Sequence, residues 1–229
     1  MYVRRTTSNG MSEEEKIETV KFKMMTEEFH QGIDIVREYN PAVTMYGSTR
    51  IKDGQPFYER VRKLAYRITK ELNYAVLSGG GPGIMEAANR GAFEAGGKSV
   101  GLTIKLPTEQ TANPYLTDEI PFHYFFARQS AMSFSTEVCI FCPGGFGTLN
   151  ELFEILTLQQ TNKIGRIPVI LFGSEFWGPI DSMIRENLLN KYQTVSSSDV
   201  NIYMISDSED EILEIIKNSQ FRDGKDSLN

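Results

Sequence analysis

The stretch Pro143-Gly-Gly-Phe-Gly-Thr-Leu-Asn-Glu151 directly follows the apolar run Glu137-Val-Cys-Ile-Phe-Cys142. An apolar run, then glycines, then apolar residues at helical spacing predict a strand, a tight turn and a helix. Turns of this kind bind anions, because glycines remove side chains that would block a phosphate and the helix start offers unpaired N–H groups. We therefore expect an anion at the three glycines, which are Gly144, Gly145 and Gly147.

The same stretch carries a carboxylate that could do chemistry. Its spacing predicts that Glu151 lies in the first helical turn, facing whatever the glycines hold. The alternative is a capping box, in which Thr148 caps the N3 amide and Glu151 bonds back to the N-cap amide. Spacing alone leaves both interpretations open.

Length and composition limit the classes of protein to consider. The chain has 229 residues, 40% of them hydrophobic, which is enough for one large domain with a buried core. Its net charge of −6 argues against a nucleic-acid-binding protein, since such proteins present a basic face to phosphates. No apolar run reaches the roughly 18 residues of a membrane span and no signal-peptide pattern opens the chain, so we expect a cytoplasmic protein without a membrane partner.

Cysteines and histidines give no metal or redox pattern. Cys139 and Cys142 lie in an apolar strand, where residues three apart point to opposite faces, so we expect buried, reduced thiols. His30 and His123 have no ligand partners at a recognisable spacing. We expect neither a metal nor a bound cofactor.

Strand and helix patterns alternate along most of the chain. The predicted strands cover 42–46, 74–78, 99–104, 137–142, 167–172 and 200–205, and the predicted helices cover 57–72, 84–94, 127–134, a stretch ending near 160, 176–189 and 210–216. The pattern predicts an α/β fold, a Rossmann-like doubly wound parallel sheet with helices on both faces. We expect an N-terminal arm and helices over 1–40, the sheet domain over 41–218 and a polar tail over 219–229. Residues 105–120 read as an irregular loop, which contains Glu109.

Two further turns follow predicted strands. The turn Gly47-Ser48-Thr49-Arg50 can hold a phosphate through a hydroxyl, a backbone amide and a guanidinium. The turn Gly79-Gly-Gly-Pro-Gly83 includes Gly80 and Gly81 as candidate phosphate contacts. It departs from the dinucleotide fingerprint because position 84 is Ile, and no acidic residue follows where a ribose ligand is expected. A mononucleotide or sugar phosphate is favoured over NAD.

The glycine motif at 143–151, together with Ser78-Gly-Gly-Gly-Pro-Gly-Ile-Met-Glu-Ala87, resembles the LOG (Lonely Guy) family, often labelled "possible lysine decarboxylase". The resemblance spans about residues 43–205. It implies a Rossmann-like homodimer that hydrolyses the N-glycosidic bond of nucleoside 5′-monophosphates. In cytokinin-activating members the products are a free base and ribose 5-phosphate, and for this chain AMP or an N6-modified AMP is the expected substrate.

The resemblance also assigns roles to individual residues. It implies that Arg128 and Glu151 are catalytic. It further implies a set of substrate and phosphate contacts, which comprises Gly47, Ser48, Glu109, Gly144, Gly145, Gly147, Thr148 and Thr157. Two departures from the family are Gln129, where a Lys commonly follows the Arg, and Phe125-Phe126, where the family has a His-containing stretch.

The implied mechanism has a physical basis. Breaking the glycosidic bond builds positive charge on the ribose, which Glu151 could stabilise while it orients a water. A phosphate held by the glycine turns would fix the ribose against this carboxylate. Whether Arg128 binds phosphate or orients Glu151 is left open by the sequence.

Two other functions compete with hydrolysis, a decarboxylase and a non-catalytic carrier. A pyridoxal-phosphate decarboxylase needs a Schiff-base lysine, and none of the lysines lies in a glycine turn at the predicted mouth of the site. The stronger rival is a non-catalytic nucleotide or cofactor carrier, which would keep the glycine turns but would not depend on Arg128 and Glu151.

Overall fold

The structure is a computed structural model that describes residues 13–105, 111–134 and 136–219. Seven parallel strands form one sheet in the order β4-β3-β2-β1-β5-β6-β7. The strands are β1 (Ala42–Tyr46), β2 (Ala75–Ser78), β3 (Ser99–Ile104), β4 (Asp118–Phe122), β5 (Val138–Phe141), β6 (Val169–Phe172) and β7 (Tyr203–Ser206). The predicted α/β class with a parallel sheet is confirmed.

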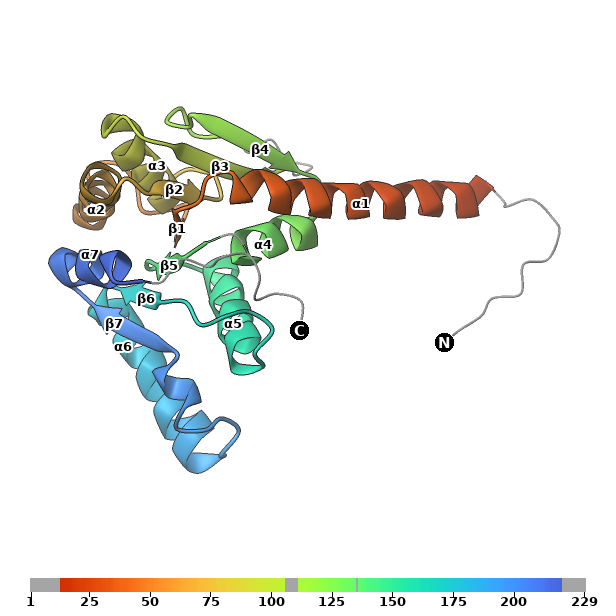
Figure 1. The fold of residues 1–229 in the computed structure, drawn as a ribbon. Coiled ribbons are helices and arrows are strands. Elements are labelled where there is room, and N and C mark those ends of the chain that lie inside the picture. The colour runs from red at the N-terminus through yellow and green to blue at the C-terminus, as the bar shows by residue number, and fades with distance from the viewer. Residues whose placement is uncertain (1–12, 106–110, 135, 220–229) are drawn as a thin grey trace.

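Helices cover both faces of this sheet (Figure 1). They are α1 (Glu13–Arg37), α2 (Pro56–Leu72), α3 (Ile84–Glu94), α4 (Phe125–Phe134), α5 (Phe146–Gln160), α6 (Ser174–Met183), the π-helix η1 (Ile184–Lys191), the short 3-10 helix η2 (Asp199–Asn201) and α7 (Glu209–Lys217). Buried side chains of α2, α3 and α7 form one core layer, and those of α4, α5, α6 and η1 form the other.

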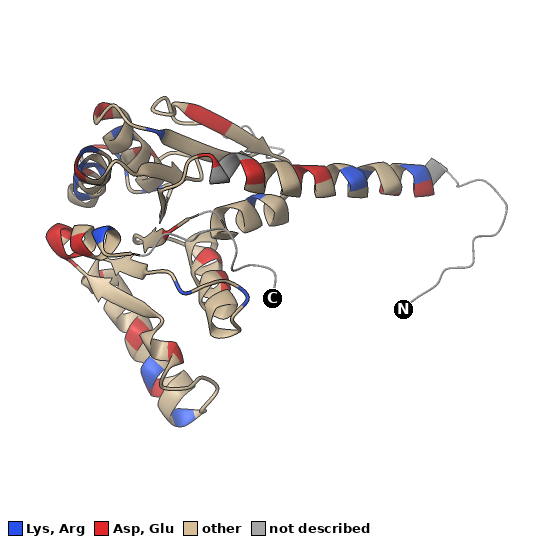
Figure 2. Ribbon diagram, viewed as in Figure 1, with Lys and Arg blue, Asp and Glu red and all other residues tan. Residues whose placement is uncertain are grey.

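The alternation of side chains within β1 produces the two layers. Ala42 and Tyr46 pack into the layer under α4 and α5, whereas Val43 and Met45 pack into the layer under α2 and α3. Strands buried on both faces are nearly continuous apolar runs, as parallel sheets require. In Figure 2 the charged residues lie mainly on helices, and the central strands carry none.

The cysteines follow the same rule. Cys139 belongs to one core layer and Cys142 to the other, and both are buried, reduced thiols, as predicted.

Strand β4 is the main element that the sequence analysis missed, because residues 105–120 were predicted to be irregular. The strand contains Asp118, Glu119 and Pro121, whose charge and missing N–H argue against a central strand. Its position at the edge of the sheet explains why they are tolerated, since an edge strand has one unpaired, solvent-facing side.

The first helix is longer than the body of the domain requires. Its C-terminal half packs on α4, with Phe29 stacked on Phe126 at 5.5 Å between ring centroids. Its N-terminal half extends past the sheet (Figure 1), and Ile17, Val20 and Phe22 on this half are exposed. Helix α1 lies within the region 1–40 that was predicted to hold an N-terminal arm and helices; residues 1–12 of that region, and most of the predicted tail, lie outside the described residues.

Candidate active site

A cleft of about 990 Å³ opens at the carboxyl edge of the sheet, above the junction of β1 and β5. The chain leaves β1 towards one edge of the sheet and returns to β5 before it proceeds to the other edge. In doubly wound sheets this switch in strand order creates the crevice that binds ligands. The two loops meet there directly, because the Ser48 N–H donates to the Pro143 carbonyl at 3.0 Å.

Helix α5 points its N-terminus into this cleft. Gly145 is the N-cap in extended conformation, and the first intrahelical bond runs from the Leu149 N–H to the Gly145 carbonyl at 3.0 Å. The amides of residues 146–148 therefore precede the helical bonding pattern. Among the described residues, no side chain caps this end and no acidic residue lies in the first turn. The arrangement favours an anion, because free N–H groups and the positive end of the helix dipole coincide.

Glu151 lies one turn deeper in α5 than the sequence predicts. Because Phe146 and Gly147 are already helical, Gly145 is the N-cap and Glu151 falls in the second turn. Thr148 is inside the helix and makes no capping bond, so the capping-box interpretation is wrong. The two glycines around Phe146 hid this early helix start, since glycine has low helix propensity.

Glu151 faces Arg128, which is the fourth residue of α4. The Arg128 Nη1 group donates to Glu151 Oε1 at 3.4 Å, and its Nε donates to the Leu102 carbonyl at 2.6 Å. Both side chains are largely buried, with 10% of Arg128 and 19% of Glu151 exposed. The guanidinium is thus fixed by β3 and held against the carboxylate.

The environment of Glu151 favours the protonated form more than water does. Burial raises the pKa of Glu151 above its ordinary value, and the charge and hydrogen bond of Arg128 only partly offset this effect. A second carboxyl on α5, Glu154, has its pKa raised by burial and then by the charge of Glu151. A carboxyl group whose pKa is raised above its ordinary value is suited to acid–base catalysis.

The glycines at the cleft have two different roles: some allow close packing and others leave open space. A Cβ on Gly47 would collide with Ile84, and one on Gly144 would collide with Thr148, so these two allow close packing below the cleft. A Cβ on Gly145 or Gly147 would meet nothing within 4 Å. These two therefore keep the approach to the α5 amides open.

The turn after β1 supplies further polar groups to the cleft. Ser48 Oγ accepts the Arg50 N–H at 3.0 Å, which leaves the hydroxyl proton free to bond a ligand. The Ser48 carbonyl accepts the Ile84 N–H at 2.9 Å and so ties this turn to the start of α3. Arg50 is exposed and lines the cleft.

Most of the predicted site residues line this one cleft; they are Gly47, Ser48, Arg128, Gly144, Gly145, Gly147, Thr148 and Glu151. Gly80, Gly81 and Thr157 lie outside it. The Gly80 and Gly81 carbonyls accept bonds from Asn113, and the Thr157 hydroxyl donates to the Phe153 carbonyl on exposed helix surface. Glu109 lies outside the described residues.

Gly79 is the glycine of the second turn that reaches the cleft, although it is not among the predicted site residues. A Cβ there would collide with the Arg128 guanidinium and with Met85, so glycine is required for Arg128 to lie where it does. Its place directly after β2 was the available signal.

Phe125, Phe146 and Phe176 also line the cleft, and Phe146 is 93% exposed, so its side chain can contact a ligand.

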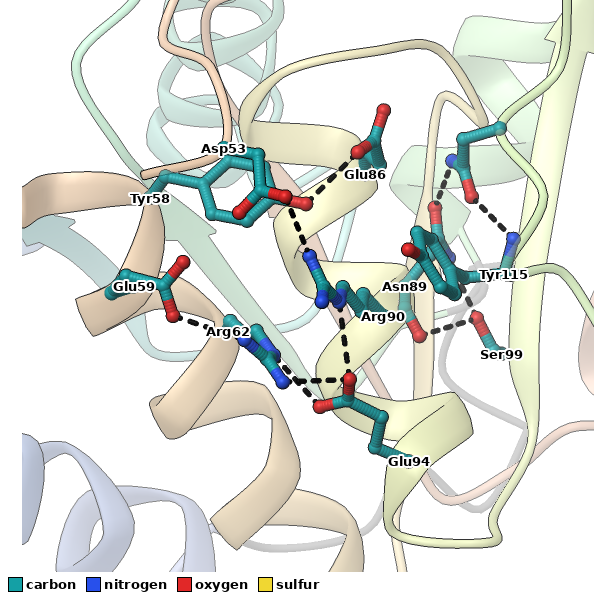
Figure 3. Close-up of polar contacts among 11 residues, drawn as sticks. Asp53, Tyr58, Glu59, Arg62, Glu86, Asn89, Arg90, Glu94, Ser99 and Tyr115 are labelled. Carbon is teal, nitrogen blue, oxygen red and sulfur yellow. Dashed lines mark hydrogen bonds and ion pairs between the residues drawn. The ribbon is translucent and has the colours of Figure 1, made fainter. Parts of the chain in front are cut away.

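A buried polar network fixes the second turn, and Figure 3 shows the part of it that joins Asn89 to Ser99. The fully buried Asn89 accepts from Ser78 Oγ at 2.6 Å and from Asn113 Nδ2 at 2.9 Å, and donates to Ser99 Oγ at 3.0 Å. Ser78 Oγ in turn accepts the Gly80 N–H at 3.0 Å. Buried polar groups that are all paired specify one arrangement, so this network holds the turn rigidly beside Arg128.

A separate ionic cluster joins α2 to α3 at the surface. Glu94 accepts from Arg62 and from Arg90, and Arg90 also pairs with Asp53 at 2.9 Å (Figure 3). Exposed pairs of this kind contribute about 0–1 kcal/mol each.

No group of three or more His, Cys, Asp and Glu side chains in the described ranges could hold a metal ion. The described helices include none with the length and apolar character needed to cross a membrane.

Comparison with known proteins gives a consistent family. The model of the family described as "Possible lysine decarboxylase" matches residues 85–216. A cytokinin riboside 5′-monophosphate phosphoribohydrolase of Rhodococcoides fascians is 25% identical over 158 residues, which is 67% of this chain and 78% of that protein. A protein of the same description from Arabidopsis thaliana is 23% identical over 139 residues, covering 58% of this chain and 65% of that protein.

Solved structures share the fold. The molybdenum cofactor carrier protein of Chlamydomonas reinhardtii superposes with a TM-score of 0.57 at 22% identity, covering 77% of this chain and 96% of that one. A molybdenum cofactor binding protein from Rippkaea orientalis gives 0.54 at 22% identity, covering 77% and 95%. At this identity the likeness concerns the fold, which serves both hydrolases and carriers.

Proposed function

The chain belongs to the possible lysine decarboxylase family, in which the LOG proteins are grouped, and we propose that it hydrolyses the N-glycosidic bond of nucleoside 5′-monophosphates. AMP or an N6-modified AMP is the proposed substrate, and the products are the free base and ribose 5-phosphate. The relatives named as phosphoribohydrolases support the reaction class. The observation that carries the proposal is the buried Arg128–Glu151 pair in the same cleft as the open N-terminus of α5.

In this proposal the phosphate group anchors the nucleotide in the cleft. It accepts hydrogen bonds from the free amides at the start of α5 and from the Ser48 hydroxyl, and Arg50 adds a positive charge at the cleft. Holding the phosphate fixes the ribose, which converts attack by water into an oriented reaction within one complex.

Glu151 acts on the sugar. As the C1′–N bond breaks, positive charge develops on the ribose, and the carboxylate stabilises that charge and accepts a proton from the attacking water. The hydroxyl then bonds to C1′ and the electron pair leaves with the base, which takes up a proton. Arg128 orients Glu151, because one of its N–H groups is fixed on the Leu102 carbonyl while another faces the carboxylate.

The test is incubation of the purified protein with AMP and, in parallel, with adenosine, followed by detection of free adenine and of the sugar product. Adenine and ribose 5-phosphate should appear from AMP. Adenosine, which lacks the 5′-phosphate, should react at least about a hundredfold more slowly. No base from AMP, with AMP still bound, would favour the carrier function that the same fold serves in other proteins.

We also propose that the chain acts as a homodimer, which the family resemblance implies. Light scattering on the eluting protein tests this directly: twice the chain mass of 25.9 kDa supports the dimer, and the single mass contradicts it.

A further inference from the structure

A second hollow of about 550 Å³ lies beside the cleft, at the carboxyl ends of β6 and β7. Its walls are Phe57, Arg60, Gly173, Ser174, Glu175 and Asp207. We call it the side compartment. It shares Pro143 and Phe176 with the cleft, so the two spaces are neighbours across the turn that precedes α5.

The strand order fixes where the side compartment lies relative to the reacting groups. Arg128 is bound to β3 and packs on Gly79 after β2, on one side of the cleft. The α5 amides follow β5 in the middle, and the side compartment lies beyond them on the β6 side. A nucleotide with its ribose near Glu151 and its phosphate at α5 therefore directs its phosphate end towards the side compartment.

Arg60 is the cation of this compartment, and its position is fixed. Its guanidinium carbon lies 4.6 Å from the Phe172 ring centroid and 5.4 Å from that of Phe57. One terminal nitrogen donates to the Asp207 backbone carbonyl at 2.8 Å. In the described part of the chain no carboxylate forms an ion pair with Arg60, whereas its neighbours Arg62 and Arg67 on α2 are both paired.

Neither acidic residue of the side compartment, Glu175 or Asp207, forms an ion pair with Arg60 in the described part of the chain. The Asp207 carboxylate accepts the Ser174 N–H at 2.9 Å and the Ser174 hydroxyl, and so serves as the cap of α6. Glu175 is exposed at the rim. The remaining N–H groups of Arg60 are therefore the charged donors available inside the compartment, and guanidinium donors match phosphate oxygens well.

We propose that the side compartment binds a second phosphate, so that the ligands of this protein include nucleoside 5′-diphosphates, with the inner phosphate at the start of α5 and the outer phosphate on Arg60. This rests on the proposed function only in placing the inner phosphate and the ribose. Among adenine nucleotides, ADP is the simplest ligand that meets the description.

The experiment is calorimetric titration of AMP and of ADP, without divalent metal, into the full chain carrying Glu151→Gln, so that neither nucleotide is consumed. ADP should bind about tenfold more tightly than AMP, as one added charge-assisted contact allows. Arg60→Gln in the same background should remove this advantage and leave AMP affinity within about twofold. Arg50→Gln should weaken both nucleotides alike, and Lys63→Gln, on the exposed face of α2, should change neither.

Equal affinities for AMP and ADP, equal losses on Arg60→Gln, or no binding of either nucleotide would each overturn the proposal. Arg60→Lys, which keeps the charge, should retain part of the ADP advantage, and thermal unfolding of each variant reports on folding. Base release from AMP by the unmodified protein is scored separately. If the protein binds ADP through Arg60 but releases no base, the proposed hydrolase activity is contradicted and the second phosphate site is still supported.

Discussion

Helices α5 and α6 both begin after a buried strand and a glycine, but the N-terminus of α6 is capped by a carboxylate and that of α5 is open. Each follows a buried parallel strand and a glycine, Gly145 before α5 and Gly173 before α6. The start of α6 is filled by the chain itself, since the Asp207 carboxylate accepts the Ser174 N–H and hydroxyl. The start of α5 has no such carboxylate among the described residues and opens on the cleft.

A ligand can bind at the start of α5 but not at the start of α6, because only the α5 end lacks an anion from the described chain. Both helix starts attract a negative charge, because each presents free amides and a positive dipole end. At α6 the anion is a structural residue, so that end contributes to stability. At α5 the anion must come from outside, and the neighbouring Arg128–Glu151 pair can act on whatever carries it.

The largest expected effect comes from making α5 resemble α6. Gly145→Asp introduces a carboxylate at the N-cap, where the backbone is extended and a new Cβ meets nothing within 4 Å. The variant should fold at least as stably, since Asp is a favoured N-cap. It should lose about a hundredfold or more in kcat/KM for AMP, because two negative charges would share one site.

Gly145→Asn is the matched control for this change, because it adds the same shape without the charge. It should lose much less activity than Gly145→Asp. Equal losses in the two variants would mean that the cleft excludes bulk, not charge, and that α5 does not bind the phosphate.

The sequence could predict much of this comparison. Apolar runs, glycine turns and helical spacing identify both helices and the strands before them, since these patterns reflect burial and backbone freedom near each residue. The Gly145 cap and the depth of Glu151 were missed, because Phe146-Gly147 looks like a turn when read locally. The same limit applies to β4 and to Asp207, whose roles depend on strand order and not on nearby residues.

The carboxylates of Glu151, near the start of α5, and of Asp207, at the start of α6, should also respond differently to pH. Hydrogen bonds from the Ser174 hydroxyl and N–H lower the pKa of Asp207, whereas burial raises the pKa of Glu151 and Arg128 only partly offsets it. If ionised Glu151 is required, activity should fall on acidification at a pH above the ordinary glutamate value of about 4.3.

Removing Arg128 sharpens that prediction. In Arg128→Met the pKa of Glu151 should rise further, so the acid limb of the kcat/KM profile should move to higher pH, with a loss of about tenfold or more at pH 7. Arg128→Lys should restore part of the shift. An acid limb that stays in place in Arg128→Met would mean that this limb reports another group.

The smallest expected effect comes from opening α6. Asp207→Asn should cost about 1 kcal/mol of unfolding free energy at pH 7 and change kcat/KM for AMP by less than about twofold. Because the pKa of Asp207 is lower in the folded state, its contribution is present above the unfolded pKa of about 3.9 and is lost as pH falls through the folded value. Urea unfolding at pH 7 and at pH 3 measures both; a cost that persists undiminished at the lower pH would argue against a charge effect.

The most direct test of the account is to measure AMP binding and adenine release on the same preparation of Glu151→Gln, beside Glu154→Gln as a control. Glu154 is the carboxyl one turn further along α5, half-buried and outside the cleft lining. We expect Glu151→Gln to bind AMP within a few-fold of the unmodified protein and to release adenine at least about a hundredfold more slowly, while Glu154→Gln keeps most of its activity. Adenine release by Glu151→Gln at a rate close to that of the unmodified protein would contradict it.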